Sequence, residues 1–269
     1  MADEKRDARE NGLPRAEWDR FWDSRQTIED VYSNDKRVIE ALRSVLDPRG
    51  KTILEVGAGS GRDSIELAKA GARLIVLDYS LNSLSLVKQE SSGSKNVELV
   101  CADACLLPFR NGSLDAAFHQ GLLEHFKDPS LLMAEQNRVL KEGGIVLVDV
   151  PQKFHLYTIV KHILMALGLW LVSWETQYTV GGLENVLRAN GFSPVSAYGD
   201  WMVPGLFYRG TRYLLMRLRI ARLPLYPRGI PVVTAVSESF RRWFRKKKVS
   251  YYTYFVIGVI ARKECRCPR

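Results

Sequence analysis

Ile53-Leu-Glu-Val-Gly-Ala-Gly-Ser-Gly61 is the stretch that decides the fold predicted for this chain of 269 residues. The apolar run that enters it, Thr52–Val56, has the length and composition of a buried parallel strand, and the glycines that follow turn the chain sharply. Glycine permits a positive φ and lets a ligand approach the backbone closely. A helix predicted over Asp63–Ala70 stops at Gly71. A strand, a glycine loop and a helix in this order predict a nucleotide-binding unit.

The spacing of the glycines and the acid before them indicate which nucleotide binds. In the G-x-G-x-x-G fingerprint of dinucleotide sites the last glycine comes one place later, where this chain has Arg62. Glu55 stands two residues before the first glycine. Its carboxylate would repel a pyrophosphate but suits a cofactor with a free amino group and a positive sulfur. The sequence therefore favours S-adenosylmethionine over NAD.

Further strands follow at regular intervals and predict an α/β fold. They are expected at Arg73–Leu77, Val97–Cys101, Leu114–His119 and Ile145–Val150, then near Pro194–Tyr198 and over Tyr251–Ala261. Their alternation with helical segments predicts a parallel sheet with right-handed crossovers, in which ligands bind beyond the carboxyl ends of the strands. Glu55, Asp78, Asp103 and His119 all fall there. Asp78 is placed to accept hydrogen bonds from both ribose hydroxyls.

Five motifs in order resemble the class I S-adenosylmethionine-dependent methyltransferases. They read LEVGAGSGRDSIELAKAG, VLDYS, CADACLLPFRNGSLDAAF, LLEHF and VLKEGG. The chain is most similar to the small-molecule branch that includes quinone-biosynthesis enzymes (methyltransferase type 11), over Lys51–Val150 and more weakly beyond. The resemblance implies a doubly wound, Rossmann-like sheet of seven strands with the last strand antiparallel. It also implies direct, in-line methyl transfer.

The resemblance also implies which residues hold the cofactor. Glu55 and the glycine loop hold its methionine part, Asp78 its ribose, and Asp103 with Ala104 its adenine, while His119 and Gln120 close over it. The full predicted cofactor set is Glu55, Gly57, Ala58, Gly59, Gly61, Asp78, Tyr79, Asp103, Ala104, His119 and Gln120.

Methyl transfer needs a base only when the acceptor must lose a proton, as a phenol does. The candidates are His125, His119 and His155, because an imidazole near its ordinary pKa suits the task. The alternative for His125 is packing or helix capping. The sequence shows no metal-ligand cluster, so we expect a reaction without metal. It leaves open whether oxygen, nitrogen or carbon is methylated.

The predicted organisation has three parts. Residues 1–14 are expected to form a disordered tail, 15–48 a helical lid and 49–269 the methyltransferase domain, with helical insertions at about 153–176 and 202–249. Trp18, Phe21 and Trp22 recur at helical spacing, either as a core stripe or as a lid over the ligands.

The first insertion is apolar and bears on the acceptor. Its uninterrupted apolar part, Ile163–Trp174, is shorter than the roughly 18 residues that a membrane span needs. It is interpreted either as an extra core helix or as the wall of a pocket for a small hydrophobic acceptor such as a quinone, lipid or phenol.

The second insertion carries the positive charge of the chain. Residues 207–248 hold nine Arg, three Lys and one acid, a net +11 against +9 for the whole chain. Arg241, Arg242 and Arg245 lie opposite Phe240 and Trp243 on a predicted helix, a pattern typical of helices on anionic membrane surfaces. The alternative is that the arginines solvate helices that cap the acceptor cavity.

A basic patch also suits RNA phosphates, so an RNA- or tRNA-modifying methyltransferase is an alternative. The loop His119–His125 lacks the prolines of amino-directed base methyltransferases, which makes nucleic acid the weaker prediction. A cofactor-binding protein without turnover is a further alternative. The four cysteines form no pair at metal or redox spacing, which predicts a reducing, cytoplasmic compartment with contact to a membrane surface as a hypothesis. The sequence does not indicate an oligomeric state.

Overall fold

A seven-stranded sheet forms the centre of the computed structural model, which describes residues 15–23, 36–91, 94–169, 174–227 and 231–265. The strands are β1 (Thr52–Val56), β2 (Arg73–Asp78), β3 (Val97–Cys101), β4 (Leu114–Gln120), β5 (Leu140–Pro151), β6 (Phe192–Asp200) and β7 (Val256–Lys263). Their order is β3-β2-β1-β4-β5-β7-β6. Strands β1 to β5 pair in parallel, and β7 runs antiparallel to both β5 and β6. The predicted doubly wound α/β sheet with an antiparallel last strand is confirmed.

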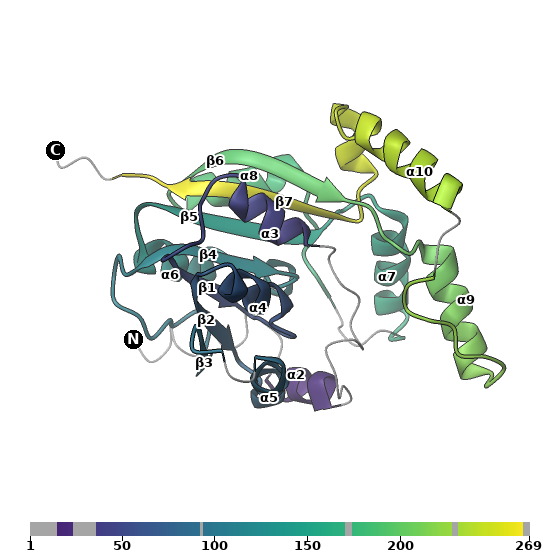
Figure 1. Ribbon diagram of the computed structural model, residues 1–269, viewed down its shortest axis with the longest axis horizontal. Coiled ribbons are helices and arrows are strands. Elements are labelled where there is room, and N and C mark those ends of the chain that lie inside the picture. Colours follow the sequence, from purple (N-terminus) through teal and green to yellow (C-terminus); the bar gives the residue numbers. More distant parts are fainter. Residues whose placement is uncertain (1–14, 24–35, 92–93, 170–173, 228–230, 266–269) are drawn as a thin grey trace.

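Helices cover both faces of this sheet, because the buried parallel strands are apolar on both sides. One face packs against α3 (Arg37–Arg43), α4 (Arg62–Lys69) and α5 (Leu81–Glu90), through side chains such as Val38, Leu67 and Leu84. The other face packs against α6 (Ser130–Val139) and α8 (Val180–Ala189), through Leu132 and Leu187. Figure 1 shows these layers around the sheet. The two cores hold the carboxyl ends of the strands in fixed positions.

The remaining helices lie outside the two layers. Helix α2 (Arg15–Asp23) packs on α5, where Ser80 Oγ donates to Asp19 Oδ1 at 2.6 Å. Helix α7 (Leu156–Ala166) follows β5, and α9 (Leu206–Arg217) and α10 (Pro231–Phe244) lie between β6 and β7 in the chain. Figure 1 places α7, α9 and α10 together at one end of the molecule.

Several predicted boundaries move. The strand predicted from Tyr251 begins at Val256, because Lys248–Tyr252 forms a 3₁₀ turn (η3), in which Ser250 N donates to Lys247 O. Tyr251 instead donates its hydroxyl hydrogen to Ala197 O at 2.9 Å. Strand β4 continues to Gln120 rather than ending at His119. The predicted tail, residues 1–14, lies outside the described residues.

Candidate cofactor and acceptor site

The glycine loop joins β1 to α4 at the carboxyl edge of the sheet. Gly57, Gly59 and Gly61 have φ values of 64°, 54° and 60°, a conformation that other residues rarely adopt. Ala58 N donates to Leu77 O at 3.1 Å, which ties the loop to β2. At Gly59, an added Cβ would lie 2.7 Å from Cζ2 of Trp22. The ring from α2 therefore packs directly against the loop, as expected of a helix that covers this edge.

Asp78 is the last residue of β2, and its carboxylate links the loop after β1 to the turn after β2. Its Oδ2 accepts from Gly59 N and its Oδ1 from Ser80 N, both at 2.8 Å. Burial raises the pKa of the carboxyl, and the backbone donors of Ser80 and Gly59 oppose that shift. The Ser83 hydroxyl and the Tyr79 backbone also act on this carboxyl, so the hydroxyls of a ligand would share its roughly four acceptor positions with them.

Glu55 is the group in the structure whose surroundings most clearly fit a cationic ligand. The side chain is 4% exposed, and its Oε2 is buried with no hydrogen-bond partner in the part of the chain that the structure describes. Burial raises the pKa of this carboxyl well above its usual value, and the nearby charge of Asp63 raises it further. A buried acid with an unsatisfied oxygen is stabilised by an ammonium group and destabilised by a phosphate. The residues present therefore fit S-adenosylmethionine.

The other predicted cofactor residues at β2 and β3 form an open rim. Tyr79 is 39% exposed, with the Arg15 guanidinium 5.5 Å from its ring centroid. Asp103 is exposed, and its Oδ1 accepts from Cys105 N at 2.8 Å, which shapes the turn after β3. Ala104 is half-buried against the core. This rim is therefore accessible to a flat ligand such as adenine.

His119 and Gln120 are the last two residues of β4, one residue longer than the predicted strand, and adjacent strand residues point to opposite faces of the sheet. Gln120 Nε2 donates to Asp63 Oδ2 at 2.5 Å and Gln120 Oε1 accepts from Arg37 at 3.4 Å, which orients this side chain toward α3 and α4. His119 is fully buried, and both ring nitrogens lack a partner among the described residues. Burial lowers the pKa of His119 to about 3, so its ring is neutral.

A buried ion pair that sequence reasoning missed holds α3 against the end of the sheet. Arg37 Nε donates to Asp149 Oδ2 at 3.0 Å and its Nη2 to Asp149 Oδ1 at 2.8 Å, a bidentate arrangement. Tyr198 also donates its hydroxyl hydrogen to Asp149 Oδ2 at 2.9 Å. Because Arg37 also reaches Gln120, this network fixes the position of that predicted cofactor residue.

A second polar cluster, also missed, lies between α7 and the 3₁₀ turn η2 (Leu123–His125). Lys161 Nζ pairs with Glu175, and the two side chains are 6% and 7% exposed. Burial first, and then the charge of Glu175, raises the pKa of Glu124 to about 8. Glu124 Oε2 and Thr158 Oγ1 are buried without a hydrogen-bond partner in the described part of the chain. We call Glu124, Thr158, Lys161 and Glu175 the η2–α7 cluster, and its unsatisfied atoms can bind a polar group.

His125 lies between this cluster and α2. Its ring centroid is 4.9 Å from that of Trp18, edge to face, and its Nδ1 is buried without a partner among the described residues. Burial and then the charge of Lys161 lower the pKa of His125 to about 4. The ring is therefore neutral near pH 7 and a weaker base than the imidazole of ordinary pKa that the sequence analysis expected.

His155 caps α7 in the structure, because its Nδ1 accepts from Tyr157 N at 3.2 Å. We expect His155→Ala to lower the free energy of unfolding by about 1 kcal/mol, whereas His155→Asn keeps a capping acceptor and stays close to the wild-type value. Denaturant unfolding of the two variants checks this. A methyl-transfer rate about 100-fold lower in the Asn variant would instead support the predicted role as a base.

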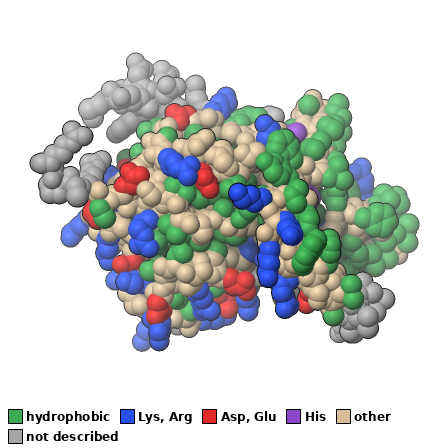
Figure 2. Space-filling view, turned by 90° about the horizontal axis from the view of Figure 1, so that it is seen from above, with side chains coloured by type: hydrophobic (Ala, Val, Ile, Leu, Met, Phe, Trp, Pro, Cys, Tyr) green, Lys and Arg blue, Asp and Glu red, His purple; other side chains and the backbone are tan. Residues whose placement is uncertain are grey.

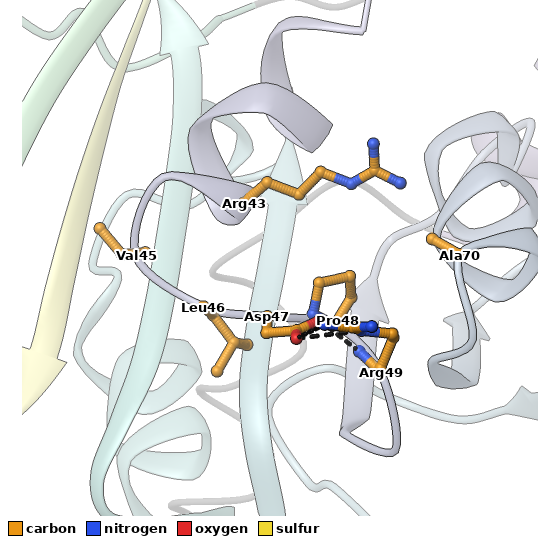
Figure 3. Close-up of a pocket in the computed structure, with 7 residues that line it drawn as sticks. All are labelled: Arg43, Val45, Leu46, Asp47, Pro48, Arg49 and Ala70. Carbon is orange, nitrogen blue, oxygen red and sulfur yellow. Dashed lines mark hydrogen bonds and ion pairs between the residues drawn. The ribbon is translucent and has the colours of Figure 1, made fainter.

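A surface hollow of about 610 Å³ lies away from all these residues. It is lined by Arg43, Val45, Leu46, Asp47, Pro48, Arg49 and Ala70. Figure 3 shows these side chains around the chain that enters β1, with Asp47 and Arg49 paired. These segments lead into the amino ends of the strands, whereas ligands of this fold bind at the carboxyl ends. The hollow is therefore not the candidate site.

Comparison with known proteins agrees with this geometry. The sequence profile of the methyltransferase domain family matches residues 54–148, which run from β1 into β5. A demethylmenaquinone methyltransferase of Clavibacter sepedonicus is 32% identical over 127 residues, 47% of this chain and 52% of that protein. The matched region spans about half the length of such curated relatives or less.

Solved structures show the same fold. A methyltransferase of Haloferax volcanii, in complex with the Trm112 methyltransferase activator, aligns with a TM-score of 0.60 at 17% identity, over 86% of this chain and 90% of that one. A phosphoethanolamine N-methyltransferase of Haemonchus contortus, solved with phosphomonomethylethanolamine and S-adenosylhomocysteine, aligns with a TM-score of 0.56 at 18% identity, over 87% and 53%. At these identities the likeness shows the fold alone.

The profile match over residues 54–148, the strand order and the glycine loop together make this part of the chain similar to a class I methyltransferase domain. Within that class, the chain is similar to methyltransferases of the quinone-biosynthesis type.

Proposed function

We propose that this chain transfers a methyl group from S-adenosylmethionine to a small hydrophobic acceptor that carries a polar reacting end. The observation that carries the proposal is the buried, unsatisfied Oε2 of Glu55 beside a glycine loop with positive φ. When bound, S-adenosylmethionine supplies an activated methyl carbon. The protein then has to hold the cofactor, orient the acceptor and exclude water.

Each part of the site has one of these tasks. Glu55 accepts hydrogen bonds from the cofactor's ammonium group, and Asp78 accepts from its ribose hydroxyls. Tyr79, Asp103 and Ala104 flank the adenine on the open rim. Trp22, packed against Gly59, covers the glycine loop and excludes water from it. Removing water strengthens the electrostatic interaction of Glu55 with its ligand.

The acceptor is proposed to lie between η2 and α7. Its polar end meets the unsatisfied oxygens of Glu124 and Thr158, and its apolar part lies along α7. A quinone or a related phenol has this combination, and the demethylmenaquinone relatives support that class. Of the three predicted bases we choose His125, because it adjoins the η2–α7 cluster, whereas His155 Nδ1 is occupied by a helix cap. Burial lowers the pKa of His125 to about 4, so it is a weak base in the cofactor-free protein.

The test is transfer of labelled methyl from S-adenosylmethionine to a cell extract split into lipid, small polar and RNA fractions. We expect label in the lipid fraction with the wild-type chain and none with Asp78→Ala as a matched control. Label in RNA would contradict the acceptor class and favour the RNA-modifying alternative. No label in any fraction, together with tight cofactor binding, would favour a cofactor-binding protein without turnover.

A further inference from the structure

One end of the molecule collects most of its exposed apolar surface. Of the 24 large hydrophobic side chains that are exposed in the described residues, 19 lie in two segments, Phe154–Leu169 and Phe207–Tyr252. Phe207 is 88% exposed, Leu169 69% and Ile220 66%. Helix α9 contains no buried residue at all over its twelve positions. Such a concentration on one part of a surface is a mark of an interaction site.

The exposed apolar side chains belong to one continuous region, which we call the α7/α9/α10 face. Tyr157 of α7 and Arg209 of α9 both contact the ring of Phe255, with centroid distances of 5.2 and 5.9 Å. Helix α10 joins through Trp201, whose ring lies 6.2 Å from that of Phe244. Figure 1 places the three helices at the same end, and Figure 2 shows hydrophobic side chains gathered there with Lys and Arg beside them.

The positive charge of the chain is concentrated on the same face. Residues 207–248 carry a net charge of +11, which leaves −2 for the rest of the chain, and Arg228 alone among these cations lies outside the described residues. Several of these cations make contacts within the protein: Arg245 pairs with Asp200 at 2.7 Å, Arg241 lies over the ring of Trp201, and Arg209 and Arg212 donate to backbone carbonyls. Others, including Arg242, Lys246 and Lys248, have exposed side chains. The face thus combines exposed apolar tips with exposed cations.

We propose that the α7/α9/α10 face docks on an anionic lipid bilayer. A second copy of the chain would bring two strongly positive faces together and repel, and RNA phosphates would pair with the cations but leave the aliphatic tips in water. An anionic bilayer can bind both the cations and the apolar side chains, since the cations meet headgroups while the apolar side chains enter the upper acyl region. None of the described helices is both long and apolar enough to cross a membrane. The contact is therefore peripheral.

Helix α7 links this surface to the candidate site. Its inner side chains, Thr158 and Lys161, are buried in the η2–α7 cluster, whereas Ile159 and Ile163 point outward and are 47% and 55% exposed. An apolar acceptor could thus pass from the lipid along α7 without crossing bulk water. This link to acceptor delivery rests on the proposed function, but the docking itself needs neither cofactor nor acceptor.

The test is co-sedimentation of the full chain with vesicles of phosphatidylglycerol and phosphatidylcholine, compared with phosphatidylcholine alone. We expect binding to the anionic vesicles that weakens as salt rises. The triple variant Arg242→Gln, Lys246→Gln, Lys248→Gln should bind about 100-fold more weakly, which corresponds to about 3 kcal/mol. The variant Phe207→Ser with Leu218→Ser should also bind more weakly, and should do so at every salt concentration.

Matched controls remove the same kinds of side chain elsewhere. Arg43→Gln with Lys95→Gln and Arg110→Gln removes three exposed cations, and Val195→Ser with Leu131→Ser removes exposed apolar groups. Both controls should bind like the wild type. The proposal would be overturned by equal binding to both vesicle types, by no binding at all, or by an equal loss in controls and test variants. It would also be overturned if the triple variant lost RNA binding while its vesicle binding stayed unchanged. Because the assay contains no cofactor, its failure leaves methyl transfer untouched.

Discussion

Glu55→Gln is expected to weaken S-adenosylmethionine binding by about 30-fold or more and, at neutral pH, to make the cofactor-free protein more stable. The loss of affinity follows because the variant removes the charge that pairs with the ammonium group, a change worth about 2 kcal/mol or more in a buried pair. The gain in stability follows because at neutral pH the buried Glu55 must either stay charged without a full set of partners or bind a proton above its usual pKa, and both cost free energy that the neutral Gln does not. Few substitutions at a structural residue would lower the affinity for S-adenosylmethionine and at the same time raise the stability of the cofactor-free protein.

The stability of the cofactor-free protein and its affinity for S-adenosylmethionine are expected to change with pH in opposite directions. The pKa of Glu55 in the folded, cofactor-free protein lies above its usual value of 4.5, because burial disfavours the charged form. Between the unfolded and folded pKa values the folded state binds more protons, so its stability falls as pH rises through that window. Cofactor binding needs the ionised form, so affinity rises over the same window. The contribution of Glu55 to both trends should be absent from the Gln variant, whereas the contribution of Glu124, whose pKa is also raised, should remain in its stability.

Thermal unfolding and calorimetric titration, each repeated from pH 5 to pH 9, measure these two trends. Glu66→Gln is a suitable control, since Glu66 is a carboxylate on α4 that pairs with Lys69. It should change neither trend. A Gln variant at position 55 that binds the cofactor like the wild type at every pH would contradict the role given to Glu55.

Gly59→Val is expected to abolish cofactor binding. Its φ of 54° lies in a region that a β-branched residue adopts only under strain, and an added Cβ would lie 2.7 Å from the Trp22 ring. The side chain would thus displace both the glycine loop and the helix that covers it. The first clash is with the Trp22 ring of α2, which the sequence alone does not predict.

Gly112→Val separates backbone strain from the clash with Trp22. Gly112 has a similar φ of 61°, but an added Cβ there would meet nothing within 4 Å. This control should lose about 1–2 kcal/mol of stability from backbone strain and keep its affinity for S-adenosylmethionine. Tryptophan fluorescence should report the displaced Trp22 in the Gly59 variant only. Wild-type affinity in Gly59→Val would contradict the loop assignment.

The sheet could be predicted from the sequence because its buried parallel strands are short, apolar and followed by marked turns. Thr52–Val56 and Asp78 were found in this way, since strand composition and spacing are local properties. Tyr251 was not, because a run of aromatic residues has high β-propensity but here forms a 3₁₀ turn held by the bond from Tyr251 to Ala197. Tertiary contacts decided that segment.

The polar contacts of the site were harder to predict for a similar reason. Arg37 and Asp149 are 112 residues apart, and nothing local to either position indicates their bidentate pair. Glu124 and His125 stood in a motif that the sequence did reveal. Their shifted pKa values arise from burial first, and then from the charge of Glu175 for Glu124 and of Lys161 for His125. Burial depends on the whole fold, so the sequence could propose these residues but not their protonation states.

Calorimetric titration of the full chain with S-adenosylmethionine, and separately with NAD, tests the central claim most directly. The arrangement of Glu55, Asp78 and the glycine loop predicts saturable binding of S-adenosylmethionine with one site per chain and no binding of NAD. Binding of NAD, or binding of S-adenosylmethionine that is unchanged in Asp78→Ala, would contradict it.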